Sequence, residues 1–149
     1  MLLHLFGQST PKQLAQSDAI CTALQLINHW QDVAIDAIKG EAGRIYLPQD
    51  ELARFNVTED DLRRRIVSTN WRDLMKFQLD RARDLMLQGA PLGWALPGRF
   101  GMEIRAIVAG GLRVADKIEA CDFDVFERRP TLKTWDWPAI FWATLVRPL

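Results

Sequence analysis

The chain has 149 residues and a formal net charge of zero, and 48% of its residues are hydrophobic, which fits one ordinary globular domain. The balanced charge gives no electrostatic case for a nucleic-acid partner. Two cysteines, Cys21 and Cys121, do not suggest a disulfide framework or a zinc site. The start MLLHLFGQSTPK lacks the basic residues of a signal peptide, and no apolar run is long enough to span a bilayer. These features predict a cytoplasmic protein.

The predicted elements are helices, because the chain shows no persuasive period-two alternation that would indicate strands. Thr10 and Pro11 begin a long first helix, and Gly40 ends it. Helices are expected over residues 11–39, 49–54, from Thr58 onward, and over 71–88, 99–120 and 136–146. The sequence therefore predicts an all-α fold in a single domain over residues 1–149.

One face of the first helix carries four polar side chains, Gln25, Asn28, Asp32 and Asp36. At about 100° per residue, these side chains fall within an arc of roughly 80°. Nearly every other residue between positions 23 and 36 is apolar. A helix that is apolar almost all round is expected to be buried, and buried carboxylates are paired, protonated or bound to metal. We therefore predict that this polar stripe lines an internal cavity that holds cations.

Asp32 and Asp36 are the predicted metal ligands, because carboxylates supply the hard oxygen atoms that suit Mg²⁺. Mg²⁺ usually completes its shell with substrate phosphates, so the stripe is interpreted as a diphosphate site at which Mg²⁺ acts as a Lewis acid. Asn28 is a further candidate ligand, and Gln25 is a candidate for binding the diphosphate. Either amide could instead be a hydrogen-bonded buried group. The alternative for the two acids is a solvated face, or ion pairs with arginine on a neighbouring helix.

Several nearby residues are expected to have structural roles. His29, about 60° from Asp32, could act as a base, but a histidine beside apolar residues is more often a hydrogen-bonded core residue. Cys21 is expected to pack inside the buried helix. Gly110 and Gly111 cost helix stability, and they permit either close helix packing or room for a chain-like ligand.

The segment ALQLINHWQDVAID at residues 23–36, followed by GRIYLP at 43–48, resembles the second aspartate-rich region of the squalene/phytoene synthases. The resemblance continues at residues 52–57, in RARDLMLQGAPL from Arg81, and in LPGRFGMEIRAIVAGGLRVADKIEACDFDVFERRP from Leu96, so it covers essentially the whole chain. It implies an isoprenoid-synthase-type helical bundle that acts on a prenyl diphosphate with Mg²⁺.

Arg44 and Tyr46 match the Arg-x-Tyr element of this family. The match implies that Arg44 binds diphosphate oxygens and that Tyr46 donates to the diphosphate or orients the pocket. The alternatives are that Arg44 pairs with an acid and that Tyr46 only packs. The residues Gly-Glu-Ala at 40–42 look like a small insertion, which either lengthens the loop harmlessly or displaces Arg44.

Gln31 stands where phytoene and dehydrosqualene synthases usually have arginine, and Trp-Gln-Asp is similar to the bacterial hydroxysqualene synthases of the hopanoid pathway. The resemblance thus implies conversion of presqualene diphosphate and water to hydroxysqualene and diphosphate. The alternatives are presqualene diphosphate synthesis from farnesyl diphosphate, phytoene or dehydrosqualene synthesis, and a non-catalytic role as an assembly factor.

Complete members of the family are longer and carry two aspartate-rich motifs on facing helices, whereas this chain has one. Asp80 and Asp84 repeat the spacing, but they lie among arginines on a face expected to be solvated. The chain is expected to be the C-terminal half of a synthase, inactive by itself or a truncated chain. Half a bundle leaves apolar faces uncovered, which predicts self-association. An apolar substrate predicts loose association with the inner membrane surface.

Overall fold

Helices form all the regular secondary structure in residues 10–37 and 44–146, which are the residues that the computed structural model describes. In chain order they are α2 (Pro11–Asp36), α3 (Gln49–Arg54), α4 (Glu59–Arg63), α5 (Thr69–Gly89), α6 (Leu92–Ala95), α7 (Gly98–Ala120), the 3₁₀ turn η1 (Thr134–Asp136) and α8 (Trp137–Leu145). The all-α prediction is confirmed.

The predicted helix starts follow from the caps that the sequence supplies. Thr10 caps α2 in a capping box with Gln13, and Pro11 occupies the first turn. Thr58 caps α4 in the same way through Asp61. The last predicted helix is found as α8, one residue shorter at each end and preceded by η1, and the four-residue α6 was not predicted. The predicted end at Gly40 and the Gly-Glu-Ala insertion lie outside the described residues.

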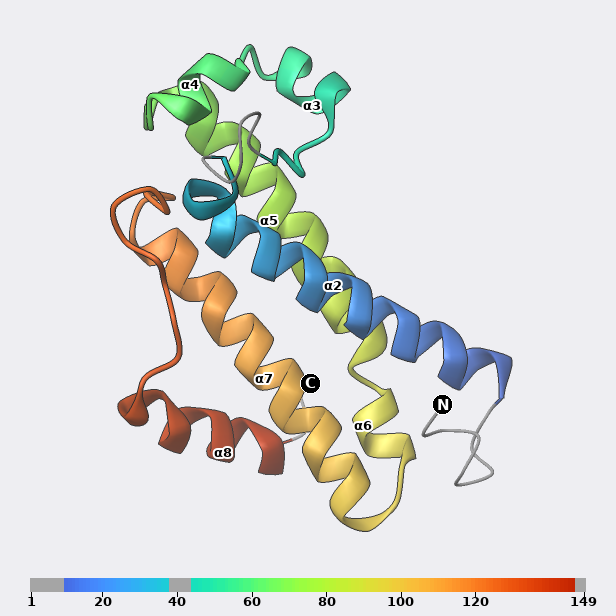
Figure 1. Cartoon of the computed structure of the whole chain (residues 1–149). Coiled ribbons are helices and arrows are strands. Elements are labelled where there is room, and N and C mark those ends of the chain that lie inside the picture. Colours follow the sequence, from blue (N-terminus) through green and yellow to red (C-terminus); the bar gives the residue numbers. More distant parts are fainter. Residues whose placement is uncertain (1–9, 38–43, 147–149) are drawn as a thin grey trace.

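Three long helices, α2, α5 and α7, form the body of the structure (Figure 1). α5 packs along α2, and α7 packs against both. α3 and α4 lie at one end of this body, α6 connects α5 to α7 at the other end, and α8 packs chiefly against α7. α2 therefore presents the predicted polar stripe on a helix whose opposite side is fixed by α5.

The core forms because the apolar residues of α2 and α5 recur at helical spacing. α2 buries Ile20, Ala23, Ile27, Trp30 and Val33. The matching residues of α5 are Trp71, Leu74, Met75, Leu79, Ala82 and Met86, all at most 1% exposed. Cys21 is exposed, so the prediction that it packs in a buried helix was wrong: α2 buries only the side that faces its neighbours.

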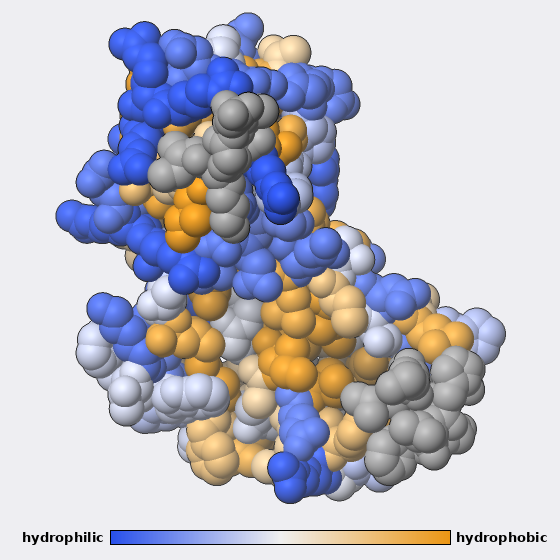
Figure 2. Space-filling view, in the orientation of Figure 1, coloured by the Kyte–Doolittle hydropathy of each residue, from blue (hydrophilic) through white to orange (hydrophobic). Residues whose placement is uncertain are grey.

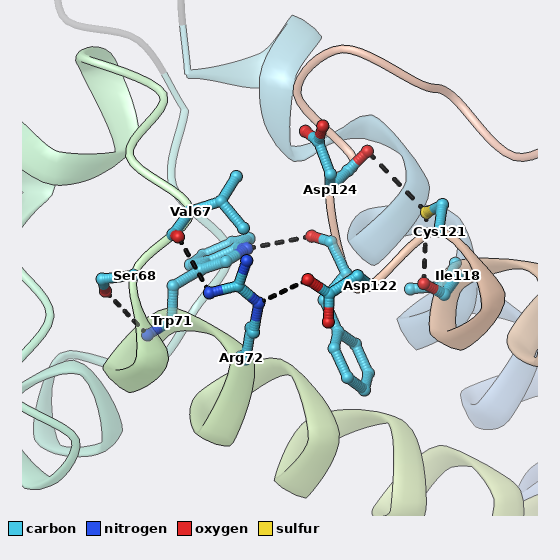
Figure 3. A network of polar contacts seen from close by, with 9 residues as sticks. Val67, Ser68, Trp71, Arg72, Ile118, Cys121, Asp122 and Asp124 are labelled. Carbon is cyan, nitrogen blue, oxygen red and sulfur yellow. Dashed lines mark hydrogen bonds and ion pairs between the residues drawn. The ribbon is translucent and has the colours of Figure 1, made fainter.

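A polar network joins the start of α5 to the turn that follows α7 (Figure 3). Trp71 donates from Nε1 to the carbonyl oxygen of Phe123 at 3.0 Å, and Arg72 donates from Nε to Asp122 at 2.7 Å. Asp122 and Phe123 both have positive φ, 57° and 59°, a backbone conformation that side chains other than glycine adopt only when contacts hold it. The network therefore fixes the path of the chain that returns from α7 toward α2.

Apolar side chains gather on the surface over α6, α7 and α8, in the lower half of Figure 2, whereas the upper half is mostly hydrophilic. On and beside α8, Trp135, Trp137, Phe141 and Trp142 are each at least 58% exposed. None of the described helices has both the length and the apolar character needed to cross a membrane.

Candidate functional site

The polar stripe of α2 runs from an exposed end to a buried end. Gln25 and Asn28 are exposed, the Asp32 side chain is 32% exposed, and Asp36 is buried at 7%. The prediction that the whole stripe lines an internal cavity is therefore wrong for the described part of the chain. Only its far end, at Asp36, is enclosed.

A groove of about 370 Å³ lies beside the stripe, between α2 and α7. Asn28 and Gln31 supply its polar lining, whereas Gln25, Asp32 and Asp36 are not among the residues that line it. Its other walls are apolar and come from α2, α7, Leu132 and Trp137. The structure thus brings Asn28, but not the two aspartates, into the lining of an apolar groove of a size that suits a chain-like ligand.

Gly110 and Gly111, the two α7 glycines that line this groove, have different surroundings. A Cβ atom on Gly111 would lie 2.6 Å from Met86 Cε and 3.1 Å from Leu24 Cδ2, so close packing explains this glycine. A Cβ atom on Gly110 would meet only Leu132 Cδ1, at 3.6 Å. Close packing is thus observed at Gly111, whereas Gly110 leaves space beside Leu132, and a ligand in that space stays a prediction.

Asp32 forms an ion pair with Arg129, whose Nε lies 2.7 Å from the Asp32 Oδ1 atom. The neighbouring Gln31 donates from Nε2 to the backbone oxygen of Pro130. The segment after α7 therefore contacts α2 at the aspartate motif. The network in Figure 3 holds the turn at which this segment begins. An ion pair with arginine was the alternative predicted for the aspartates. At Asp32 such a pair is observed, but its arginine lies in the segment between α7 and η1 and not on a neighbouring helix.

Arg44 returns to the end of α2, where its backbone N–H donates to the Asp36 carbonyl oxygen at 2.7 Å. The Arg44 side chain is exposed. Tyr46 is 46% exposed, and its ring stacks on His29 with the centroids 4.0 Å apart and the planes 16° from parallel. Tyr46 therefore packs against α2, as the alternative prediction for this residue stated. The same stacking contact holds the His29 ring.

The side chains of this helix face are suitable ligands for Mg²⁺, but only two of them are carboxylates. Asn28, Asp32 and Asp36 lie at successive turns of one unbroken helix and offer the oxygen atoms that Mg²⁺ accepts. No group of three or more His, Cys, Asp or Glu side chains among the described residues could hold a metal ion. Mg²⁺ at this face would therefore need oxygen atoms from water, from a substrate or from another part of the protein.

Sequence reasoning missed the contributions of Arg129 and Pro130, which are 97 and 99 residues from their partners on α2. The one available signal was the FERRP sequence at 126–130, which matched a family segment.

Comparisons with known proteins identify relatives of this chain. The family model for Squalene/phytoene synthase matches residues 1–136, so α8 follows the matched part. The chain is 38% identical over 125 residues to 15-cis-phytoene synthase from Synechococcus elongatus, covering 84% of this chain and 40% of that protein. It is 33% identical over 126 residues to phytoene synthase 1, chloroplastic, from Arabidopsis thaliana, covering 80% and 29%.

Among solved structures, the chain is similar to squalene synthase HpnC from Alicyclobacillus acidocaldarius, with a TM-score of 0.76 and 33% identity over 82% of this chain and 45% of that chain. The all-helical isoprenoid-synthase-type fold is thereby confirmed. The chain spans less than half the length of each of these relatives.

Proposed function

The chain belongs to the squalene/phytoene synthase family, and from this premise we propose that it is the C-terminal part of a Mg²⁺-dependent synthase that acts on a prenyl diphosphate. Its proposed reaction converts presqualene diphosphate and water to hydroxysqualene and diphosphate. The observation that carries the proposal is that Asn28 lines a groove with apolar walls, while Asp32 and Asp36 follow it at the next two turns of the same helix. A diphosphate would lie at the polar face, and its prenyl chain would lie in the groove.

The residues of the site suit the departure of a diphosphate. Mg²⁺ bound by Asp32 and Asp36 would offset the charge that develops on the leaving group. Arg129, within ion-pair distance of Asp32, adds a positive charge where the diphosphate would sit. Arg44, held next to Asp36 through its backbone, has an exposed guanidinium that can donate to two diphosphate oxygens.

The choice of hydroxysqualene as the product rests on Gln31. In phytoene and dehydrosqualene synthases this position usually carries a permanently charged arginine, whereas Gln31 is neutral, lines the groove and donates to Pro130. A neutral amide beside the groove is compatible with the entry of one water molecule, which adds to the carbocation and then loses a proton. The apolar walls would exclude other water molecules.

Phytoene synthesis is the second candidate, favoured by the names of the relatives that the chain resembles at 33–38% identity. A non-catalytic role as an assembly factor is the third candidate. The retained Asp32 and Asp36 favour catalytic ancestry over that role.

A product assay tests these candidates. The chain is incubated with Mg²⁺ and presqualene diphosphate, farnesyl diphosphate or geranylgeranyl diphosphate, alone and together with the part of the HpnC chain that the structural match does not cover. We expect no turnover by the chain alone, and hydroxysqualene from presqualene diphosphate in the reconstituted mixture. The D32N/D36N double variant should abolish the product.

Other results of this product assay would favour one of the alternative functions. Phytoene formed from geranylgeranyl diphosphate would replace hydroxysqualene synthesis with phytoene synthesis. Absence of every product, with a complex of the two halves demonstrated by gel filtration, would favour the non-catalytic role. Activity of the chain alone would refute the proposal that it is only part of the catalytic unit.

A further inference from the structure

A second apolar groove lies between α6, α7 and α8, and it contains a single cationic side chain. Its volume is about 350 Å³, and nine apolar residues and Arg105 line it. Trp94, Leu112 and Trp142 are among its walls. Pockets that bind small molecules generally have volumes of about 300 to 1,000 Å³, so the groove is large enough for a single-chain ligand. One wall is α8, which lies beyond the residues that match the family.

Arg105 is held in place at this groove by α6. Its guanidinium carbon lies 3.9 Å from the centroid of the Trp94 ring. A Cβ atom on Gly93 would lie only 2.6 Å from Arg105 Cγ, so the arginine stem packs directly against the Gly93 backbone. Stacking on Trp94 uses the flat face of the guanidinium and leaves the N–H groups at its edge able to donate.

The charge of Arg105 has no carboxylate partner among the described residues, where its guanidinium stacks on Trp94. Its Nε atom is buried and has no hydrogen-bond acceptor in this part of the chain. A cation next to apolar walls is costly without an anion, so the groove favours a ligand that brings one. One guanidinium matches one carboxylate, whereas a diphosphate carries more negative charge than it could offset.

We propose that this groove binds a fatty acid of about ten carbons or more, with its carboxylate at the edge of the Arg105 guanidinium and its alkyl chain along Val108, Leu112 and Trp142. The proposal goes beyond the proposed synthase activity, because no residue of this groove belongs to the aspartate stripe or to the groove beside Asn28. The head group is recognised by charge, and the tail is recognised by burial of apolar surface.

The test is isothermal titration calorimetry on the 149-residue chain with decanoate, 1-decanol and decyltrimethylammonium, below the concentrations at which each aggregates. We expect decanoate to bind at least about tenfold more tightly than the neutral or cationic probe, since a hydrogen bond to a charged group contributes that much. Arg105→Gln should remove this difference. The matched control is Arg99→Gln on the same helix, where the arginine is 91% exposed, pairs with Glu103 and does not line this groove.

A second variant, Ala109→Phe, keeps Arg105 and fills the groove, so it should weaken decanoate and decanol alike. Circular dichroism of each variant establishes that the helices are intact, and Arg105→Gln still decides the question if Ala109→Phe does not fold. Equal affinities for decanoate and decanol, unchanged binding in Arg105→Gln, or no binding would overturn the proposal. It would also be overturned if farnesyl diphosphate displaced decanoate with higher affinity through Arg105, which would assign the groove to the synthase substrate.

Discussion

Replacing single glycines by alanine gives a quantitative test of how α2, α5 and α7 pack, because three glycines meet different neighbours. Alanine stabilises a helix interior by about 1 kcal/mol relative to glycine. At Gly110 the new methyl group would lie 3.6 Å from Leu132 Cδ1, an ordinary contact, so nothing offsets this gain. Gly110→Ala should therefore stabilise the chain by about 1 kcal/mol, which corresponds to a rise in Tm of about 2–4 °C.

Gly89 is the opposite case. It is the last residue of α5, and a methyl group there would lie 2.6 Å from the backbone oxygen of Gln16 in α2. Backbone atoms cannot rotate away, and overpacking of this kind typically costs about 1–3 kcal/mol. Gly89→Ala should therefore lower the free energy of unfolding. At Gly111 the close neighbour is the flexible end of Met86, so the substitution should fall between the other two.

Urea denaturation followed by circular dichroism measures the three variants against the parent chain, with an unchanged slope as the control for a comparable unfolding transition. The expected order of stability is Gly110→Ala, then Gly111→Ala, then Gly89→Ala. A Gly89→Ala variant as stable as Gly110→Ala would refute the close approach of α2 and α5 on which the position of the aspartate stripe depends.

Three further predictions concern charge and surface. Hydrogen bonding from Lys117 lowers the pKa of Asp136 to about 2 from its ordinary value of 3.8, so this carboxylate stabilises the fold above about pH 4, and the stability advantage over Asp136→Asn should disappear between pH 4 and pH 2 in acid unfolding. The half-exposed pair of Asp32 and Arg129 should show a coupling of about 0–1 kcal/mol in a double-mutant cycle of Asp32→Asn and Arg129→Gln; a coupling of several kcal/mol would contradict the exposed geometry. The chain should self-associate in light scattering at tens of micromolar, and Trp142→Lys should reduce the apparent mass; a monodisperse parent monomer would contradict this.

Local signals allowed most of the helices to be predicted from the sequence, and the misses have physical causes. Thr10 with Pro11, and Thr58 with Asp61, satisfy the first N–H groups of their helices, so these starts could be predicted from adjacent residues. α6 has only four residues, including Gly93, so it offers no period that a pattern could reveal. Such a short element is stabilised by its contacts with α7 and not by its own propensity.

The candidate site was less predictable, because it depends on contacts between distant parts of the chain. Helical spacing correctly placed Asn28, Asp32 and Asp36 at successive turns of one helix. It could not show that Asp36 is buried while Asn28 is exposed, since burial depends on which elements cover each turn. Nor could it pair Asp32 with Arg129, because these residues are 97 positions apart and meet only where the segment after α7 returns to α2.

α7 separates the two grooves, and its sequence explains why they differ. At about 100° per residue, Ala106, Ile107, Gly110, Gly111 and Val114 occupy one arc of the helix, and Arg105, Val108, Ala109 and Leu112 occupy the opposite arc. The residues of the first arc are apolar and uncharged and line the same groove as Asn28 and Gln31, whereas the second arc carries the Arg105 cation. Asp32→Asn should therefore leave decanoate affinity unchanged, and Arg105→Gln should leave the product of the reconstituted synthase unchanged. A change in either would mean that the two grooves communicate through α7.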